Sequence, residues 1–232
     1  MENIDLSIVL PAHNESENLP DLLRDLKSAL FQAAIRSEII VANDGSTDDT
    51  EKVLNSLKSE ISELSVVKIE KKSGFGNAII KGLETASGSV LGYMVADGQI
   101  QPAALVETYK KLKKDNLAFC KAFRTNRQDG FLRMTMSAVY NLLFRIMFNC
   151  SLGDIGGNPK IFTRNFYESA DLRSKDFFIE AEIMLKAKRN NFSMGEVPVI
   201  SLERKRGRSN ISLFTSLQYL KNTFSYFLLR KF

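Results

Sequence analysis

The sequence predicts an α/β fold built on a mostly parallel sheet flanked by helices. Apolar strand patterns alternate with amphipathic helical patterns through the first half of the chain, which is typical of parallel strands joined by right-handed crossovers. A short apolar run at 90–95, closed by Gly98, indicates a buried strand that delivers Asp97 and Gln99 at its end. Ligands of such sheets bind beyond the carboxyl ends of the strands, so this end is the expected site.

The first half repeats a unit of strand, turn and helix. The first strand covers 6–10 and is expected to end at Pro11, and the leucines between 19 and 30 recur at the spacing of an amphipathic helix. Further strands are expected at 38–42, 66–69 and 117–122, and further helices at 47–58, 77–85 and 102–114. This regular order favours one continuous sheet.

The second half is less regular, which indicates specialisation. Its expected elements are helices at 131–149 and 178–190, an amphipathic helix from 211, and strands at 160–162 and 195–200. No stretch of linker composition divides the chain, so we expect the 232 residues to form a single domain.

Composition and charge indicate a globular protein with an anionic partner. Hydrophobic residues make up 44% and charged residues 25%, which is enough to bury a sizeable core. Residues 1–100 carry 9 Lys and Arg against 16 Asp and Glu, a net charge of −7, whereas residues 101–232 carry 23 against 11, a net charge of +12. The basic half favours nucleic acid, phosphate or an acidic membrane surface as partner. Solvated helix faces with an excess of lysine are the alternative explanation.

The chain is expected to act in the cytoplasm, at the surface of a membrane. No segment offers the roughly 20 consecutive apolar residues that span a bilayer, but 131–152 and 211–232 could lie on one. The first residues do not resemble a secretory signal. Cys120 and Cys150 lack the spacing of metal ligands, so we expect buried thiols in a reducing compartment.

Acids and amides follow three of the strands in the first half. They are Asn14 with Glu15, Asn43 with Asp44, and Asp97 with Gln99. In a parallel sheet all three strand ends face one crevice, where carboxylates can accept hydrogen bonds from a base and a ribose and can hold a divalent cation against a pyrophosphate. Each group alone would be an ordinary turn or helix cap, but three in register indicate a site. A Walker-type phosphate loop is absent from the sequence.

A series of motifs resembles the family 2 glycosyltransferases, which have a GT-A (nucleotide-diphospho-sugar transferase, Rossmann-like) fold. The motifs lie at 7–15, 41–48, 74–82, 96–99, 154–162, 178–186 and 196–209, so they cover nearly the whole chain in the family's order. Among the subgroups, the chain is most similar to the dolichol-phosphate mannose synthase-like enzymes.

The resemblance implies transfer of a sugar from a nucleotide-diphosphate donor of the GDP-mannose or UDP-hexose type. It implies a nucleotide-sugar-binding half at 1–122 and an acceptor or membrane-interface half at 123–232. The residues that match nucleotide-sugar-binding positions are Pro11, Asn14, Glu15, Asp44, Gly74 and Asp97. Asp97 and Gln99 match positions that meet Mg²⁺ or Mn²⁺. The expected catalytic residues are Asp97, Arg124 and Arg204, and the resemblance places Arg204 and Ser209 in a late loop that closes over the phosphates.

The sequence departs from the family pattern at three places. Val95 stands where the family usually has an acid two residues before Asp97, which leaves the expected metal site one carboxylate short. Phe75 replaces a common lysine, and Asn158-Pro159-Lys160 replaces Gly-Phe-Arg. Three outcomes remain open for the metal: a cation held by Asp97, Gln99 and phosphate oxygens, an enzyme that relies on Arg and Lys, or an inactive relative.

Three arginines indicate the acceptor. Arg124, Arg127 and Arg133 follow a strand end and precede the apolar helix 134–148. Guanidinium groups bind phosphate bidentately, and an apolar helix can accept a lipid tail or lie in a membrane interface. We therefore expect a polyprenyl-phosphate acceptor whose phosphate meets Arg124, Arg133 and Ser209. Membrane contact would be direct or through a partner subunit, and the basic cluster 204–208 lacks the interleaved aromatics of a nucleic-acid site.

Two other functions remain open. A lipid phosphate needs no strong general base and would attack in line, inverting the anomeric centre. A saccharide acceptor would need a base, for which Glu180 and Glu182 are candidates, although acids are common in the first turn of a helix. A catalytically silent nucleotide-sugar-binding subunit is the alternative from another class, and Val95 is the reason to consider it.

Overall fold

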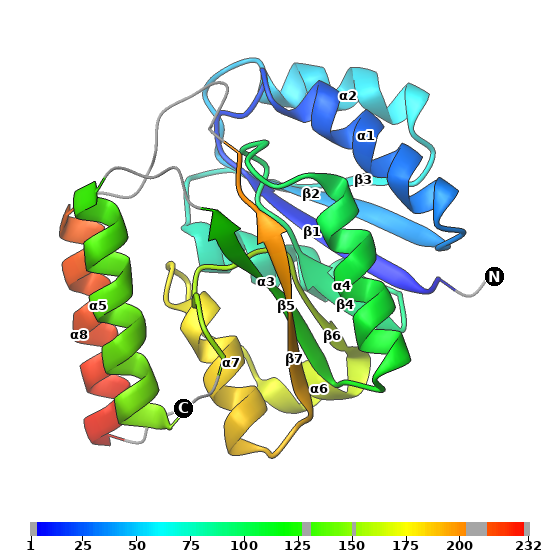
Figure 1. Ribbon diagram of the computed structural model, residues 1–232. Helices are drawn as coiled ribbons and strands as arrows, with labels where there is room; N and C mark the ends of the chain where they lie inside the picture. The colour runs from blue at the N-terminus through cyan, green and yellow to red at the C-terminus, as the bar shows by residue number, and fades with distance from the viewer. Residues whose placement is uncertain (1–3, 127–130, 150–151, 203–212, 230–232) are drawn as a thin grey trace.

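The computed structural model describes residues 4–126, 131–149, 152–202 and 213–229. Within these ranges the chain forms a seven-stranded sheet in the order β3-β2-β1-β4-β6-β5-β7 (Figure 1). The strands are β1 (Leu6–Ala12), β2 (Ser37–Asp44), β3 (Leu64–Ile69), β4 (Val90–Tyr93), β5 (Phe119–Asn126), β6 (Lys160–Thr163) and β7 (Met194–Ile200). β6 is antiparallel to both of its neighbours, and the other strand pairs are parallel. The expected α/β fold with a mostly parallel sheet is confirmed.

Helices cover both faces of the sheet. They are α1 (Leu19–Gln32), α2 (Thr50–Glu60), α3 (Phe75–Thr85), α4 (Pro102–Lys114), α5 (Phe131–Phe148), α6 (Arg164–Ala170), α7 (Ile179–Arg189) and α8 (Leu213–Leu229). α1, α2 and α4 share one apolar cluster with the sheet, and α3, α6 and α7 share the other. α5 and α8 lie side by side beyond α7 (Figure 1). Burial on both faces explains why the central strands are almost continuously apolar.

The first strand is longer than the sequence predicts. β1 continues through Pro11, which was expected to end it, and pairs with β2 as far as Ala12. Its pairing with β4 ends earlier, at Val9 and Tyr93. Pro11 therefore lies where β1 has a neighbour on one side only, and a missing N–H is tolerated at such an edge position.

The helix α6 was missed from the sequence. It has only seven residues, too few for a helical repeat of apolar positions to be recognised. Thr163 caps it by accepting a hydrogen bond from the amide of Phe166, and the Phe166 ring is buried. This short helix links β6 to the segment that leads into α7.

α5 and α8 pack against each other through polar and aromatic contacts. The hydroxyls of Tyr140 and Thr223 lie 2.7 Å apart, and the rings of Tyr140 and Tyr219 meet edge to face with centroids 4.8 Å apart. Each helix also carries an exposed apolar stripe, which we define as Val139, Leu142, Leu143 and Ile146 on α5 and Phe224, Phe227 and Leu228 on α8. No helix in the described ranges has both the length and the hydropathy to cross a membrane.

The cysteines were expected to be buried thiols. Cys120 is a free thiol buried in β5, and this burial raises its pKa to about 11. Cys150 lies outside the described residues.

Candidate functional site

The carboxyl ends of three parallel strands meet at one edge of the sheet. Ala12 pairs with Asn43 across β1 and β2, and Val9 pairs with Tyr93 across β1 and β4. The loops that follow these strands therefore leave the sheet side by side. The predicted convergence of the three polar strand ends at one edge is confirmed.

Asp44 is held in a fixed orientation at the end of β2. Its buried carboxylate accepts hydrogen bonds from the amide and hydroxyl of Ser73, both at 2.7 Å, and from the amide of Gly74 at 2.9 Å. His13 donates from Nδ1 to the carbonyl of Asp44 at 2.8 Å, so the single histidine has the structural role that a lone histidine usually has. The carboxylate is thus oriented before any ligand arrives.

Asn14 and Glu15 belong to a loop that is fastened to the loop after β2. Asn14 has a positive φ of 59°, and its side-chain oxygen accepts a 2.8 Å hydrogen bond from the amide of Thr47. Glu15 accepts from the side-chain amide of Asn18 at 2.6 Å. Asp48 lies between the two loops; burial raises its pKa, but hydrogen bonds from Ser16 and Thr50 more than offset this and leave the pKa lowered. Pro11 precedes this loop and is buried.

The glycines at the start of α3, Gly74 at its N-cap and Gly76 in its first turn, accommodate the protein's own backbone. Gly74 has a φ of 112°, and a Cβ there would lie 2.4 Å from the carbonyl oxygen of Lys175. A Cβ on Gly76 would lie 2.2 Å from the carbonyl oxygen of Ser174. Phe75, one of the departures from the family pattern, stacks on Phe177 with ring centroids 4.7 Å apart. The segment 173–178 therefore packs directly on the turn whose amides hold Asp44.

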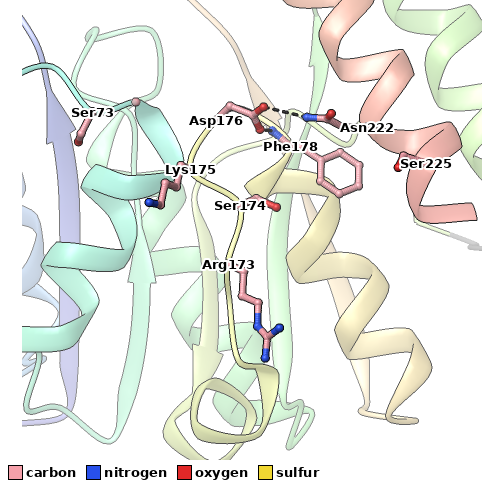
Figure 2. Close-up of a pocket in the computed structure, with 9 residues that line it drawn as sticks. Ser73, Arg173, Ser174, Lys175, Asp176, Phe178, Asn222 and Ser225 are labelled. Carbon is pink, nitrogen blue, oxygen red and sulfur yellow. Dashed lines mark hydrogen bonds between the residues drawn. The ribbon is translucent and has the colours of Figure 1, made fainter. Parts of the chain in front are cut away.

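A cleft of about 390 Å³ opens between this turn, the segment 173–178 and α8 (Figure 2). It is lined by Ser73, Gly74, Arg173, Ser174, Lys175, Asp176, Phe178, Asn222 and Ser225. Asp176 accepts hydrogen bonds from the amide of Phe178 at 2.9 Å and from the side chain of Asn222 at 2.8 Å. Asp176 therefore ties α8 to the segment, a role that sequence reasoning missed.

Asp97 and Gln99 lie in the loop after β4, because this strand ends at Tyr93 rather than at the expected residue 95. Asp97 accepts a hydrogen bond of 3.1 Å from the amide of Gln99. The side chain of Gln99 donates to the carbonyl of Leu202 at 3.2 Å, and the amide of Leu202 donates back to the carbonyl of Gln99 at 2.9 Å. The chain that follows β7 is thereby anchored beside Asp97.

The described part of the chain holds no group of three His, Cys, Asp or Glu side chains that could bind a metal ion. At the expected position Asp97 supplies one carboxylate, and the neighbouring Val95 supplies none. A cation at this position would need further oxygen ligands from a substrate.

Arg124 is paired with Asp154 at the end of β5. Its guanidinium donates from Nε at 2.8 Å and from Nη2 at 2.6 Å to the two carboxylate oxygens. Burial raises the pKa of Asp154, but the hydrogen bonds and charge of Arg124 outweigh it and bring the pKa down to about 2. This bidentate pair fixes the position of the guanidinium group.

Several expected site residues lie outside what the structure describes. Arg127, Arg204 and Ser209 fall in undescribed segments, as does the basic cluster 204–208. Arg133 lies in the first turn of α5, but its side chain is not described. Their expected roles remain predictions.

Glu180 and Glu182 are buried, although acids in a first helical turn are usually solvated. Glu182 accepts from the amides of Arg173 and Ser174 at 3.0 and 2.8 Å and pairs with Lys186 at 2.9 Å. Its carboxylate is therefore occupied in holding the segment 173–178 and is poorly placed to act as a base.

Glu180 belongs to a second buried network beneath the site. Its Oε1 accepts from the side-chain amide of Asn158 at 2.8 Å and lies 3.4 Å from Nζ of Lys160. Burial lowers the pKa of Lys160 to about 8. Lysine in a strand whose neighbours are apolar was the signal that could have revealed this network.

Comparison with known proteins decides the family. The sequence profile described as "Glycosyl transferase family 2" matches residues 7–171, well over half of the chain. The chain belongs to glycosyl transferase family 2. The resemblance seen in its motifs is therefore confirmed.

Relatives of this family 2 glycosyltransferase include two bacterial proteins named as undecaprenyl-phosphate sugar transferases. The chain is 28% identical over 210 residues to the undecaprenyl-phosphate 4-deoxy-4-formamido-L-arabinose transferase of Serratia proteamaculans, covering 90% of this chain and 63% of the relative. It is 28% identical over 209 residues to the enzyme of that name from Klebsiella pneumoniae, covering 89% and 62%. The chain thus spans less than two thirds of the length of these relatives.

Solved structures confirm the fold. The glucosyl-3-phosphoglycerate synthase of Mycobacterium tuberculosis, in complex with Mn²⁺, UDP and glucosyl-3-phosphoglycerate, matches with a TM-score of 0.73 and 21% identity. The match covers 97% of this chain and 80% of that protein. At this identity the likeness shows the GT-A fold of a family 2 glycosyltransferase and not its substrates.

Proposed function

We propose that this family 2 glycosyltransferase moves a sugar from a nucleoside-diphosphate donor to a polyprenyl phosphate, with inversion at the anomeric carbon. The observation that carries the proposal is the position of the α5–α8 pair. The pair carries exposed apolar stripes and is tied through Asp176 to the segment that packs on the donor-side turn. Both relatives described above act on undecaprenyl phosphate by name, which supports a lipid acceptor.

The donor half, 1–122, would hold the nucleotide. Asp44 would accept hydrogen bonds from the base, and Pro11, Asn14, Glu15 and Gly74 would surround the base and ribose. Asp97 would meet the diphosphate. The Mycobacterium tuberculosis enzyme is seen with UDP, which supports a UDP-linked sugar.

Asp97 and Gln99 would hold Mg²⁺ or Mn²⁺. Magnesium is usually bound by one or two carboxylates together with substrate phosphates and water, so a single carboxylate fits a cation that arrives with the donor. Mn²⁺ and Mg²⁺ accompany UDP in structures of the Mycobacterium tuberculosis enzyme. The bound cation would supply positive charge to the departing diphosphate.

The acceptor half, 123–232, would bring the lipid phosphate to the sugar. Arg124, Arg133 and Ser209 would bind this phosphate, and Arg204 would stabilise the departing diphosphate. A phosphate oxygen then attacks the anomeric carbon in line, the bond to the diphosphate breaks, and the diphosphate keeps the electron pair. No general base is required because the acceptor phosphate is already ionised near neutral pH.

The membrane would be reached by the exposed apolar stripes of α5 and α8. Apolar faces of interfacial helices insert at the boundary of headgroups and acyl chains, and the +12 charge of residues 101–232 favours anionic lipids. We place the protein at the cytoplasmic face of the membrane, either alone or with a membrane partner subunit.

The test is transfer of label from radioactive UDP- and GDP-sugars to undecaprenyl phosphate, with and without Mn²⁺. The proposal predicts a labelled glycolipid whose formation is lost in Asp97→Asn. Tight donor binding without any product would favour the silent subunit, and a product formed only with saccharides would favour the soluble acceptor.

A further inference from the structure

Lys121 on β5 is a buried cation to which the proposed function gives no role. Its side chain is 0% exposed. Its Nζ lies 3.2 Å from the carbonyl oxygen of Asp154, 3.3 Å from that of Ala122 and 3.3 Å from Oε2 of Glu196. An ammonium group has three N–H donors, so these three oxygens match its donors in number. Lys121 therefore joins parts of the chain to one another and has no donor left for a ligand.

Glu196 supports the same loop from the neighbouring strand. β5 and β7 lie side by side (Figure 1), and Lys121 is directly opposite Glu196 in their register. Oε2 of Glu196 also accepts a 3.2 Å hydrogen bond from the amide of Gly153. Burial lowers the pKa of Lys121, and the charges of Glu196 and Asp154 offset this in part. The two strands thus hold the backbone of 153–154 through one ion pair.

This backbone carries the carboxylate that orients Arg124. Asp154 has a positive φ of 41°, which is uncommon outside glycine. Its carbonyl oxygen accepts hydrogen bonds from Lys121 and, at 2.7 Å, from the amide of Gly157. Its carboxylate accepts from the backbone amide of Arg124 at 3.0 Å as well as from the guanidinium. A shift of residue 154 would therefore carry the guanidinium with it.

We infer that Lys121 and Glu196 are positioning residues for Arg124. Their ion pair fixes 153–154, the carboxylate of Asp154 fixes the guanidinium, and the guanidinium, held in one orientation, contacts the acceptor phosphate. Neither Lys121 nor Glu196 touches that phosphate. The inference deepens the proposed function, since it rests on Arg124 as a ligand of the acceptor phosphate.

The test is a double-mutant cycle that measures binding of undecaprenyl phosphate in detergent micelles by calorimetry, with undecaprenol as the reference lipid. Lys121→Met is expected to weaken binding of undecaprenyl phosphate by about tenfold, because one hydrogen bond to a charged group is misaligned. In an Arg124→Gln background the same change should cause no further loss, because Lys121 acts through Arg124. Affinity for UDP with Mn²⁺ should stay unchanged.

Two further variants separate positioning from general stability. Lys121→Met leaves the carboxylate of Glu196 without its cation, so Lys121→Met with Glu196→Gln, which removes both charges, is measured alongside it. Lys186→Met is the matched control. Lys186 is another buried lysine, 6% exposed, and its partners, Glu182 and the carbonyl of Asp171, lie outside this loop. Its loss should lower the free energy of unfolding in urea without weakening the binding of undecaprenyl phosphate.

A loss of affinity in Arg124→Gln but not in the Lys121 variants would overturn the inference alone. Equal losses for UDP and the lipid phosphate, additive losses in the double-mutant cycle, or a loss as large in Lys186→Met would also overturn it, because none of these effects passes through Arg124. Unchanged affinity in Arg124→Gln would overturn the proposed phosphate contact of Arg124 together with this inference.

Discussion

Asn222 of α8 donates a hydrogen bond of 2.8 Å to Asp176, in the segment that packs on the turn holding Asp44. Asn141 of α5 accepts one of 3.1 Å from the amide of Ile155, in the loop that carries Asp154. Both asparagines lie in helices that are mostly apolar. Each therefore joins the outer helix pair to a loop of the candidate site.

Replacing Asn222 by alanine should loosen α8. A hydrogen bond to a charged acceptor contributes about 1.5–3 kcal/mol, so Asn222→Ala is expected to lower the free energy of unfolding in urea by about 1–2 kcal/mol. Ser225→Ala is the control, because Ser225 is exposed and lines the same cleft. Equal stability of the two variants would contradict a stabilising role for the hydrogen bond from Asn222 to Asp176.

Polar substitutions in the exposed apolar stripes should reduce membrane binding. Ile146 is 71% exposed and Leu228 is 72% exposed, so Ile146→Ser with Leu228→Ser removes apolar surface without opening the core. Because membrane affinity increases with the apolar area that is buried, we expect binding to anionic vesicles in a flotation assay to fall by at least about tenfold. Phe31→Ser, at an 83% exposed position on α1, should bind as the wild type does. Loss of binding in all variants alike would argue against a specific role for α5 and α8.

The Arg124–Asp154 pair should contribute to acid stability. The pKa of Asp154 is about 2 in the folded protein against an ordinary value of 3.8, so its contribution is complete above pH 4 and is lost as the pH falls toward 2. The loss of this contribution lowers the free energy of unfolding by about 2 kcal/mol. Urea unfolding at a series of pH values should show a shallower decline between pH 4 and 2 in Asp154→Asn than in the wild type. Asp25→Asn, at an exposed position on α1, should keep the wild-type slope; an unchanged slope in Asp154→Asn would refute this account.

Restoring an acid beside Asp97 should strengthen metal binding. Val95→Asp adds a second carboxylate where cation affinity depends on ligand charge, so the Kd of Mn²⁺ in the presence of UDP is expected to fall by about tenfold. Val95→Asn, which adds oxygen without charge, is the matched control. Unchanged Mn²⁺ affinity and turnover in Val95→Asp would mean that this position does not face the cation.

The repeating elements could be predicted because they depend on local pattern. Buried strands and amphipathic helices carry their periodicity in the sequence, and in the first half this was enough to place three strand ends at one edge of the sheet. α6 was missed because seven residues are too few to show a helical repeat of apolar positions. The end of β1 was placed too early because the sequence does not show that Pro11 continues to pair with β2.

The partners of the site residues could not be predicted because they come from distant parts of the chain. Asp44 is held by residues 29 and 30 positions later, and Glu180 by Asn158 and Lys160. The apolar neighbours of Lys160 hint at burial, but a lysine in a strand is usually solvated, and the position of β6 between β4 and β5 shows that this one is buried.

The proposed acceptor is a lipid phosphate. The most direct measurement compares undecaprenyl phosphate with undecaprenol, which has the same chain but no phosphate, under a single labelled nucleotide sugar and Mn²⁺. We expect labelled product with the phosphate and none with the alcohol. Product from a saccharide acceptor, with none from undecaprenyl phosphate, would contradict it.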